Sequence, residues 1–199
     1  MSAAERTRAA RLGARLFRNR GWLPIPFVAA PLLLPGRQTA ATWVAGALIL
    51  AAGEAFRLAG VAAAGTTTRR RSRDVQRLVT YGIFAWTRNP LYVGNLLAWL
   101  GVAVASGVLW FVPVAALLFG VEYSLIVRFE EGVLESTFGD EYLSYKQSTP
   151  RWLPRPPRGG VPGGEGAHDW REAWWSERST LLQYVALAAA LVVKQFLLA

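Results

Sequence analysis

Glu54, Arg57 and Glu122 are ionisable side chains inside long apolar runs of this sequence, where charge is costly and indicates function. Glu54 and Arg57 are three residues apart, so on a helix they can form an ion pair, or one of them can line a polar pocket. Glu122 has no cation within one helical turn. It must therefore face the interior of a helix bundle, become neutral, or meet Arg57 or Arg88.

A second group of reactive residues lies at the ends of these runs. The segment TRNPLYVGN (87–95) begins one run with Arg88, Asn89 and Pro90, although a plain membrane anchor needs only about 20 apolar residues. Glu130 and Glu131 follow another run. Adjacent carboxylates at the end of a membrane span can be solvated partners of arginines, or they can hold the ammonium of a zwitterionic ligand; the residues alone leave both open.

The composition limits the possible chemistry. The 199 residues include no cysteine and one histidine, His168. Thiolate zinc sites, cysteine nucleophiles and multi-histidine metal sites are therefore excluded, and we expect no metal. The formal net charge is +9, but the arginines gather in clusters between apolar runs. This distribution is typical of the cytoplasmic loops of membrane proteins, so we do not expect nucleic acid as a partner.

The elements that must position these residues are membrane helices. Hydrophobic residues make up 53% of the chain, which includes nine tryptophans. The sequence predicts an all-α integral membrane protein with about five transmembrane helices, whose short cytoplasmic helices cover a cofactor pocket. The predicted spans are 21–35, 39–65, 89–105, 108–127 and 181–198, and the predicted cytoplasmic cofactor regions are 66–88 and 128–180.

The first predicted span is short and contains four prolines, but the charge pattern supports it. The arginines before it and those after the second run can both face the cytoplasm only if an even number of spans separates them. The N-terminus is then cytoplasmic. Residues 1–20 form a basic amphipathic segment at the lipid surface, ahead of a single membrane domain over 21–199. The richness in alanine and arginine suggests a bacterial source, hence the inner membrane.

Smaller patterns predict local structure. Gly46, Gly53 and Gly60 recur every seven residues and indicate close helix packing. Lys194, near the end of the last run, is expected to extend its charge to the membrane surface. The helical spacing of Leu134, Phe138, Tyr142 and Tyr145, interrupted by Gly139, predicts two short surface helices, with Asp140 capping the second and Asp169 capping a later one.

Three segments together resemble the superfamily of isoprenylcysteine carboxyl methyltransferases and phospholipid methyltransferases. They are GEAFRLAGVAAAG (53–65), RLVTYGIFAWTRNPLYVGNLLAWLG (77–101) and EEGVLESTFGDEYLSYKQSTPRWLP (130–154). The resemblance implies a membrane enzyme that uses S-adenosylmethionine to methylate a lipid-like substrate from the bilayer. Asn89 stands where the carboxyl methyltransferases have histidine, and in this it is similar to the phosphatidylethanolamine N-methyltransferase branch.

The resemblance also implies which residues bind the cofactor. They are Leu78, Val79, Gly82, Arg88, Asn89, Pro90, Tyr92, Gly94, Glu130, Glu131, Tyr142, Tyr145 and Arg151. Methyl transfer from a sulfonium requires positioning and electrostatics rather than a metal. Arg88 and the amides of the helix start suit the cofactor's carboxylate, and Glu130 or Glu131 suits its ammonium.

The nature of the methyl acceptor determines whether a base is needed. An amine acceptor must lose a proton, for which Glu122, Glu54 or a tyrosine is available, and Arg57 belongs to the same predicted catalytic group. A carboxylate acceptor needs no base. We expect phospholipid N-methylation, with carboxyl methylation of an isoprenylcysteine-like substrate and a non-catalytic lipid-binding or scaffold protein as the alternatives.

Overall fold

The computed structural model describes residues 8–65, 77–157 and 167–198. Helices account for nearly all regular structure in these three ranges, and no strand occurs in them, so the predicted all-α class is confirmed. The elements are α1 (Arg8–Arg18), α2 (Ile25–Leu33), α3 (Ala40–Ala64), the 3-10 helix η3 (Gly82–Ala85), α4 (Pro90–Ala105), α5 (Phe111–Phe138), α6 (Asp140–Ser148) and α7 (Trp170–Leu198).

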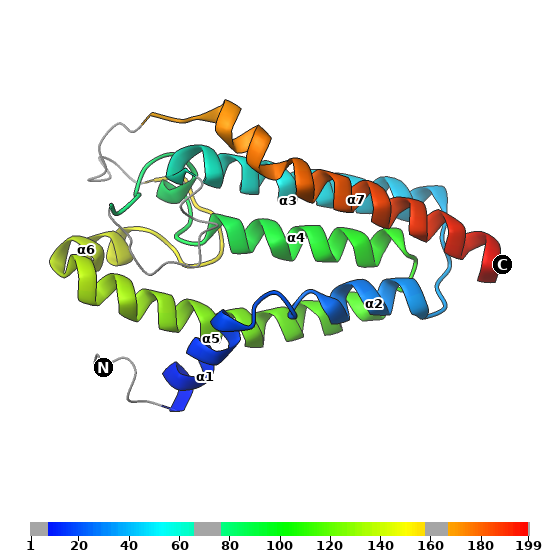
Figure 1. Cartoon of the computed structure of the whole chain (residues 1–199), viewed down its shortest axis with the longest axis horizontal. Helices are drawn as coiled ribbons and strands as arrows, with labels where there is room; N and C mark the ends of the chain where they lie inside the picture. The colour runs from blue at the N-terminus through cyan, green and yellow to red at the C-terminus, as the bar shows by residue number, and fades with distance from the viewer. Residues whose placement is uncertain (1–7, 66–76, 158–166, 199) are drawn as a thin grey trace.

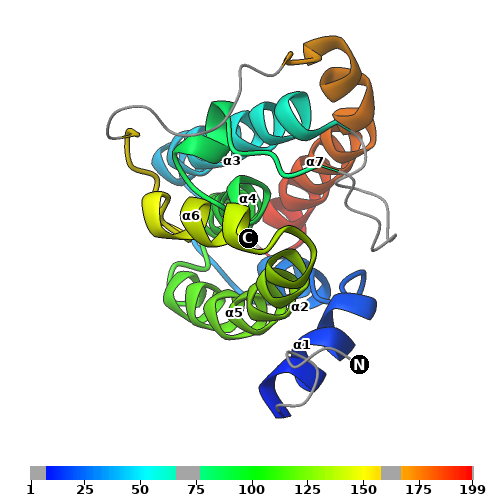
Figure 2. The same ribbon diagram turned by 90° about the vertical axis from the view of Figure 1, so that its left-hand side faces the viewer.

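The four long helices α3, α4, α5 and α7 run along the long axis of the molecule (Figure 1). The helix α6 and the loops around it lie at one end, and the C-terminus lies at the other. The view from the α6 end shows α3 and α7 on one side of α4, with α5 and α2 on the other (Figure 2). The main core lies between α2, α4 and α5 and includes Phe27, Ala103, Phe119 and Ile126.

Three helices of the described chain, α3, α5 and α7, are long and apolar enough to cross a membrane. The apolar α4 has 16 residues, or about 24 Å, and α2 has nine, or about 14 Å, against a hydrocarbon core of about 30 Å. The structure therefore supports an integral membrane protein with three candidate spans. It does not confirm the predicted number of five.

Prolines explain why α2 is short. Pro24 precedes the helix, Pro31 lies within it, and Pro35 follows its end. In a longer helix the carbonyl of Pro31 would accept from residue 35, but a proline has no N–H. The Lys194 ammonium fills this position and donates to the Pro31 carbonyl at 2.6 Å. Lys194 is 6% exposed, so the expectation that it reaches the membrane surface was wrong.

The segment that contains α2 nevertheless connects the two ends of the bundle. At one end, the ring of Phe17 lies 5.8 Å from that of Phe129, in the last third of α5. At the other, Gly36 packs against Ser106 and Gly107, beyond the end of α4. The first apolar run thus extends along the bundle, although only nine of its residues are helical.

Glycines bring α3 and α4 into close contact. A Cβ atom at Gly46 would lie 2.5 Å from the carbonyl oxygen of Gly101, and one at Gly53 would lie 2.6 Å from that of Gly94. Nothing larger than glycine fits at these positions without a shift of backbone. The predicted packing stripe is confirmed, and it brings Arg57 of α3 next to the first turns of α4.

Around α6 and in α7 the structure differs from the prediction in three respects. The first predicted short helix is the end of α5, which continues to Phe138 and stops at Gly139, where φ is 53°. Asp140 is the first residue of α6 and makes no side-chain capping bond to it. The helix α7 begins at Trp170 rather than at Leu181. The prediction for Asp169 is confirmed, because its carboxylate accepts from the Glu172 amide at 2.8 Å.

Candidate active site

A cavity of about 770 Å³ lies between the helices toward the α6 end of the bundle. Residues of the α1–α2 linker, α3, α4, α5, α6, α7 and the 77–89 loop line it. It brings together eleven of the residues that the sequence proposed for the site: Arg57, Leu78, Val79, Arg88, Asn89, Pro90, Tyr92, Glu130, Glu131, Tyr142 and Tyr145. Glu54, Gly82, Gly94, Glu122 and Arg151 do not line it.

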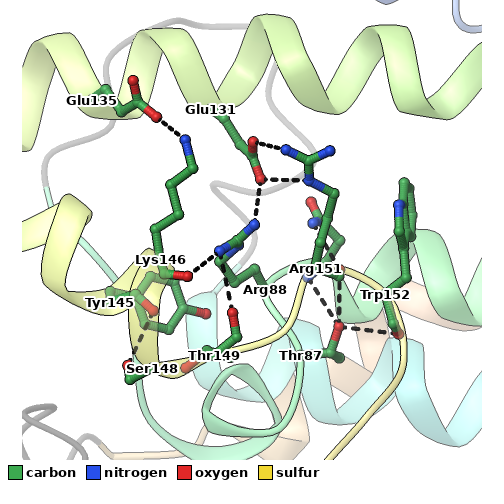
Figure 3. Close-up of polar contacts among 11 residues, drawn as sticks. Thr87, Arg88, Glu131, Glu135, Tyr145, Lys146, Ser148, Thr149, Arg151 and Trp152 are labelled. Carbon is green, nitrogen blue, oxygen red and sulfur yellow. Dashed lines mark hydrogen bonds and ion pairs between the residues drawn. The ribbon is translucent and has the colours of Figure 1, made fainter.

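The carboxylate of Glu131 is the centre of an ion-pair network beside the cavity (Figure 3). Its Oε1 accepts from Arg88 Nη2 at 2.9 Å and from Arg151 Nε at 3.0 Å. Arg88 also donates to the backbone carbonyls of Lys146 and Thr149. Arg88 and Glu131, proposed for opposite ends of one zwitterionic ligand, therefore bind each other. Together they hold the end of α6 against α5.

A second set of bonds joins the loop before α4 to the loop after α6. The Asn89 side-chain amide donates to the carbonyl of Arg151 at 3.0 Å, and the buried Thr87 hydroxyl donates to the same oxygen at 3.1 Å. The backbone amide of Arg88 donates to the Pro150 carbonyl. The side chain of Asn89, the unusual residue of its motif, thus fixes the path of the Arg151 loop.

Glu130 has a different environment from its neighbour. Its Oε1 accepts from the Tyr92 hydroxyl at 3.0 Å, and the ring of Tyr92 lies 5.0 Å from that of Tyr123. Both Glu130 and Tyr92 line the cavity. Of the two adjacent carboxylates, Glu131 neutralises arginines and Glu130 is the one with only a tyrosine as hydrogen-bond partner within the described chain.

Arg57 of α3, which also lines the cavity, pairs with two carboxylates. Its Nε lies 3.3 Å from Glu54, which confirms the predicted pair, and its Nη2 lies 2.7 Å from Glu177 of α7. Arg57 also donates to the Asn95 side chain. Glu122 makes no ion pair with Arg57, Arg88 or any other described residue, so of the three alternatives for Glu122 the contact with an arginine does not occur.

Two tyrosines of α6 close the cavity near the Glu131 network. Burial raises the pKa of Tyr142 and of Tyr145, and the Glu131 carboxylate raises the pKa of Tyr142 further. Both hydroxyls are therefore protonated at neutral pH. The hydroxyl of Tyr145 donates to the Phe84 carbonyl at 2.7 Å, which ties α6 to η3.

Two of the proposed residues, both glycines, pack against other parts of the chain and do not line the cavity. Gly94 packs against Gly53 and Arg57 of α3. Gly82 has a φ of +61°, and a Cβ there would lie 2.4 Å from His168 Nε2. Glycine is needed at both positions for close approach, and at Gly82 also for the backbone conformation.

Sequence reasoning missed several residues of the cavity. Arg20, Asn95, Glu177 and Gln183 line it, and no motif indicated them. Of these only Asn95 carried a local signal, because it is one turn beyond Leu91 in the TRNPLYVGN segment. Among the described residues no three histidines, aspartates or glutamates are grouped as metal ligands would be.

Comparisons with known proteins identify relatives of the chain. Residues 41–141 match the family model described as phospholipid methyltransferase. Human protein-S-isoprenylcysteine O-methyltransferase is 36% identical over 127 residues, which cover 57% of this chain and 42% of the human protein. The cobalt-zinc-cadmium resistance protein CzcN of Cupriavidus metallidurans is 34% identical over 131 residues, which cover 66% and 60%. The chain thus matches less than two thirds of the length of either relative. No solved structure matches it.

Proposed function

Because the chain belongs to the phospholipid methyltransferase family, we propose that it is a membrane methyltransferase that transfers the methyl group of S-adenosylmethionine to a lipid-like acceptor. The cavity is the observation that carries this proposal. Its volume of about 770 Å³ lies in the range of small-molecule sites, roughly 300–1,000 Å³. Its walls combine charged, aromatic and apolar residues, many of them from α3, α4 and α5, which the family model covers.

The residues of the cavity fit the groups of S-adenosylmethionine. Arg88 lines the cavity, and its buried Nε–H has no hydrogen-bond partner in the described ranges, as suits a carboxylate ligand. Glu130 offers a carboxylate to an ammonium. The rings of Tyr92, Tyr142 and Tyr145 offer faces for the adenine or the sulfonium. Glu131 acts through Arg88, whose guanidinium it orients.

The bound cofactor supplies an electrophilic methyl group, and the chain supplies position and a dry environment. The helices hold the acceptor in line with the methyl group, while α6 and the Arg151 loop keep water out. Of the bases predicted for an amine acceptor, Glu54 and Glu122 do not line the cavity, whereas the tyrosines Tyr92, Tyr142 and Tyr145 do. A carboxylate acceptor needs no base, and the name of the human relative supports it. Phospholipid N-methylation, which the sequence favoured, is the second candidate, and it is supported by the family description.

Topology completes the proposal. The arginine-rich segments support a cytoplasmic position for the N-terminus and the α6 end, where the cofactor is available, and the acceptor would come from the bilayer. The segment with α2 then crosses the membrane as a fifth, only partly helical span. The proposed location is the inner membrane of a bacterium.

Calorimetry with S-adenosylhomocysteine on the purified protein tests cofactor binding. We expect binding to the wild type and a Kd about tenfold or more higher for Glu130→Gln, because one charge-assisted hydrogen bond is lost. The matched control is Glu135→Gln, which is on the same helix but outside the cavity, and it should bind like the wild type. If the folded wild type does not bind S-adenosylhomocysteine, this result would contradict the transferase proposal and support the non-catalytic alternative.

Radiolabelled S-adenosylmethionine added to membranes containing the protein identifies the acceptor. Label that is lost as volatile methanol in base indicates a methyl ester, and base-stable label in extracted phospholipid indicates N-methylation. Absence of label in membranes that contain a cofactor-binding protein would contradict the transferase activity.

A further inference from the structure

Arg20 is a cavity-lining cation outside the residues that the methyltransferase motifs cover. It lies in the linker between α1 and α2, and its guanidinium carbon is 4.3 Å from the centre of the Phe17 ring. Phe17 contacts Phe129, and Gly13 of α1 packs on the backbone of Leu125. The linker is therefore held against α5, and the guanidinium has a fixed place at the cavity wall.

The partners of the cavity arginines distinguish Arg20 from the others. Arg57 is bound to Glu54, Glu177 and Asn95, Arg88 is bound to Glu131, and Arg77 donates to the Tyr81 hydroxyl. Within the described chain, Arg20 forms no hydrogen bond and no ion pair. Glu130 is within electrostatic range of it, but the hydrogen bond of Glu130 goes to Tyr92. Arg20 keeps its five donors for a ligand.

The sequence around Arg20 places it at the level of the lipid headgroups. Trp22 is 73% exposed and Ile25 is 50% exposed, and the apolar helix α2 follows. Tryptophan at this transition is typical of the membrane–water interface. In Figure 1 the linker lies on the α5 side of the bundle and α7 on the other, with α4 between them. The wall of the cavity that Arg20 lines thus adjoins the exposed apolar residues Trp22 and Ile25.

We propose that Arg20 binds an anionic group of the methyl acceptor, a phosphate or a carboxylate. Guanidinium pairs with either anion through two parallel hydrogen bonds. A partly buried cation whose close contact is an aromatic ring, with its nearest carboxylate bonded elsewhere, gains from such a ligand, because the ring does not neutralise its charge. Arg20 then selects anionic acceptors over neutral ones. This inference rests on the proposed transferase function and adds the charge of its substrate.

The binding of single-chain probes tests whether Arg20 selects anionic acceptors over neutral ones. Dodecyl phosphate, dodecanoate and dodecanol share one alkyl chain and differ in the headgroup. For Arg20→Gln we expect the binding of the anionic probes, measured by calorimetry, to weaken about tenfold, the cost of a lost charge-assisted hydrogen bond. Dodecanol binding should not change, and Arg20→Lys should lose less than Arg20→Gln. Weakening confined to dodecyl phosphate assigns the site to a phosphate, and weakening confined to dodecanoate assigns it to a carboxylate.

A matched control and a second readout separate this inference from the proposed function. Arg18 is exposed at the end of α1 and does not line the cavity, so Arg18→Gln should behave like the wild type. The Kd for S-adenosylhomocysteine should be the same in Arg20→Gln, while the KM for the acceptor rises. Equal weakening of dodecanol and the anionic probes, or unchanged anion binding, would overturn the role of Arg20. Absence of S-adenosylhomocysteine binding in the wild type would instead overturn the proposed function. The anionic probes would still show whether Arg20 binds an anion.

Discussion

Glu131 carries a buried charge that holds two arginines from separate loops. Arg88 precedes α4 and Arg151 follows α6, and both guanidinium groups reach the same carboxylate of α5. Removing one member of a buried ion-pair network is costly because the remaining charges stay desolvated without a counter-ion. Glu135, four residues later, pairs with Lys146 where both side chains are about one third exposed. Such a surface pair contributes little.

Replacing Glu131 should therefore destabilise the α6 end of the bundle far more than replacing Glu135. We expect Glu131→Gln to lower the free energy of unfolding by about 3 kcal/mol, and Glu135→Gln to lower it by less than about 1 kcal/mol. Thermal unfolding in detergent, followed by circular dichroism, measures both. Equal effects of the two variants would contradict the central position of Glu131.

We expect Tyr142 to make the stability of the α6 end of the bundle sensitive to alkali. Burial, with the Glu131 carboxylate nearby, raises the pKa of Tyr142 above its ordinary value of about 10. Above that pH the unfolded chain loses the phenol proton while the folded chain keeps it, so folding becomes less favourable. The stabilising contribution is thus complete below about pH 10 and is lost as the pH rises further. Tyr142→Phe should show a shallower fall in melting temperature between about pH 9 and 11.5 than the wild type. Parallel curves would show that another group is responsible.

Local sequence motifs identified the cavity residues at the start of α4 and near Glu130. The cavity residues of α7 and of the α1–α2 linker become evident only from tertiary contacts. The residues from Arg88 to Tyr92 and the pair Glu130 and Glu131 stand in short patterns with a chemical reason. Glu177 is 120 residues from its partner Arg57, and it looks like one more surface carboxylate in a polar segment. Only the packing of α7 on α3 reveals its role. Arg20 likewise cannot be told in sequence from the other arginines of the basic N-terminal segment.

At the scale of the helices, the contact between α3 and α4 depends on glycine. Gly53 and Gly94 face each other at the level of Arg57, so their spacing sets how closely the charged residues of α3 approach the start of α4. Gly120 of α5 gives a natural contrast, because a Cβ there would meet nothing within 4 Å.

Substitution by alanine should destabilise the protein at Gly53 and stabilise it at Gly120. Gly53→Ala forces a methyl group against the Gly94 carbonyl and should cost about 1–3 kcal/mol of stability. Gly120→Ala should stabilise the protein by up to about 1 kcal/mol, because alanine loses less backbone entropy in a helix. Unfolding in detergent compares them. A neutral Gly53→Ala variant would indicate that α3 and α4 are less tightly packed than the structure describes.

Element boundaries were harder to predict than element existence. The apolar runs located α3 and α4 to within a residue or two, since caps and prolines mark their starts. The helix α5 passes through polar residues to Phe138, because Gly132 alone does not interrupt a long helix. The helix α2 stops early because Pro35 cannot donate to Pro31, a backbone requirement that hydropathy does not record.

At the scale of the whole molecule, charge and hydropathy divide the bundle along its axis. The cavity, α6 and the ion-pair network occupy one end, and Gly36, Gly107 and Trp110 lie toward the other. Because the natural sequence has no cysteine, single cysteines report their side of the membrane without removal of native thiols. This allows the orientation and the crossing of the first apolar run to be tested together.

We expect Arg37→Cys and Trp110→Cys to react with a membrane-impermeant maleimide in intact cells, because both positions are exposed and belong to the end away from the cavity. Arg18→Cys and Leu153→Cys, also exposed but at the cavity end, should react only after the membrane is opened. Different labelling of positions 18 and 37 requires the chain between them to cross the bilayer, although α2 alone is too short to do so as a helix. Labelling of positions 18 and 37 from the same side would contradict the crossing, and labelling of Leu153→Cys in intact cells would place the cavity outside the cytoplasm.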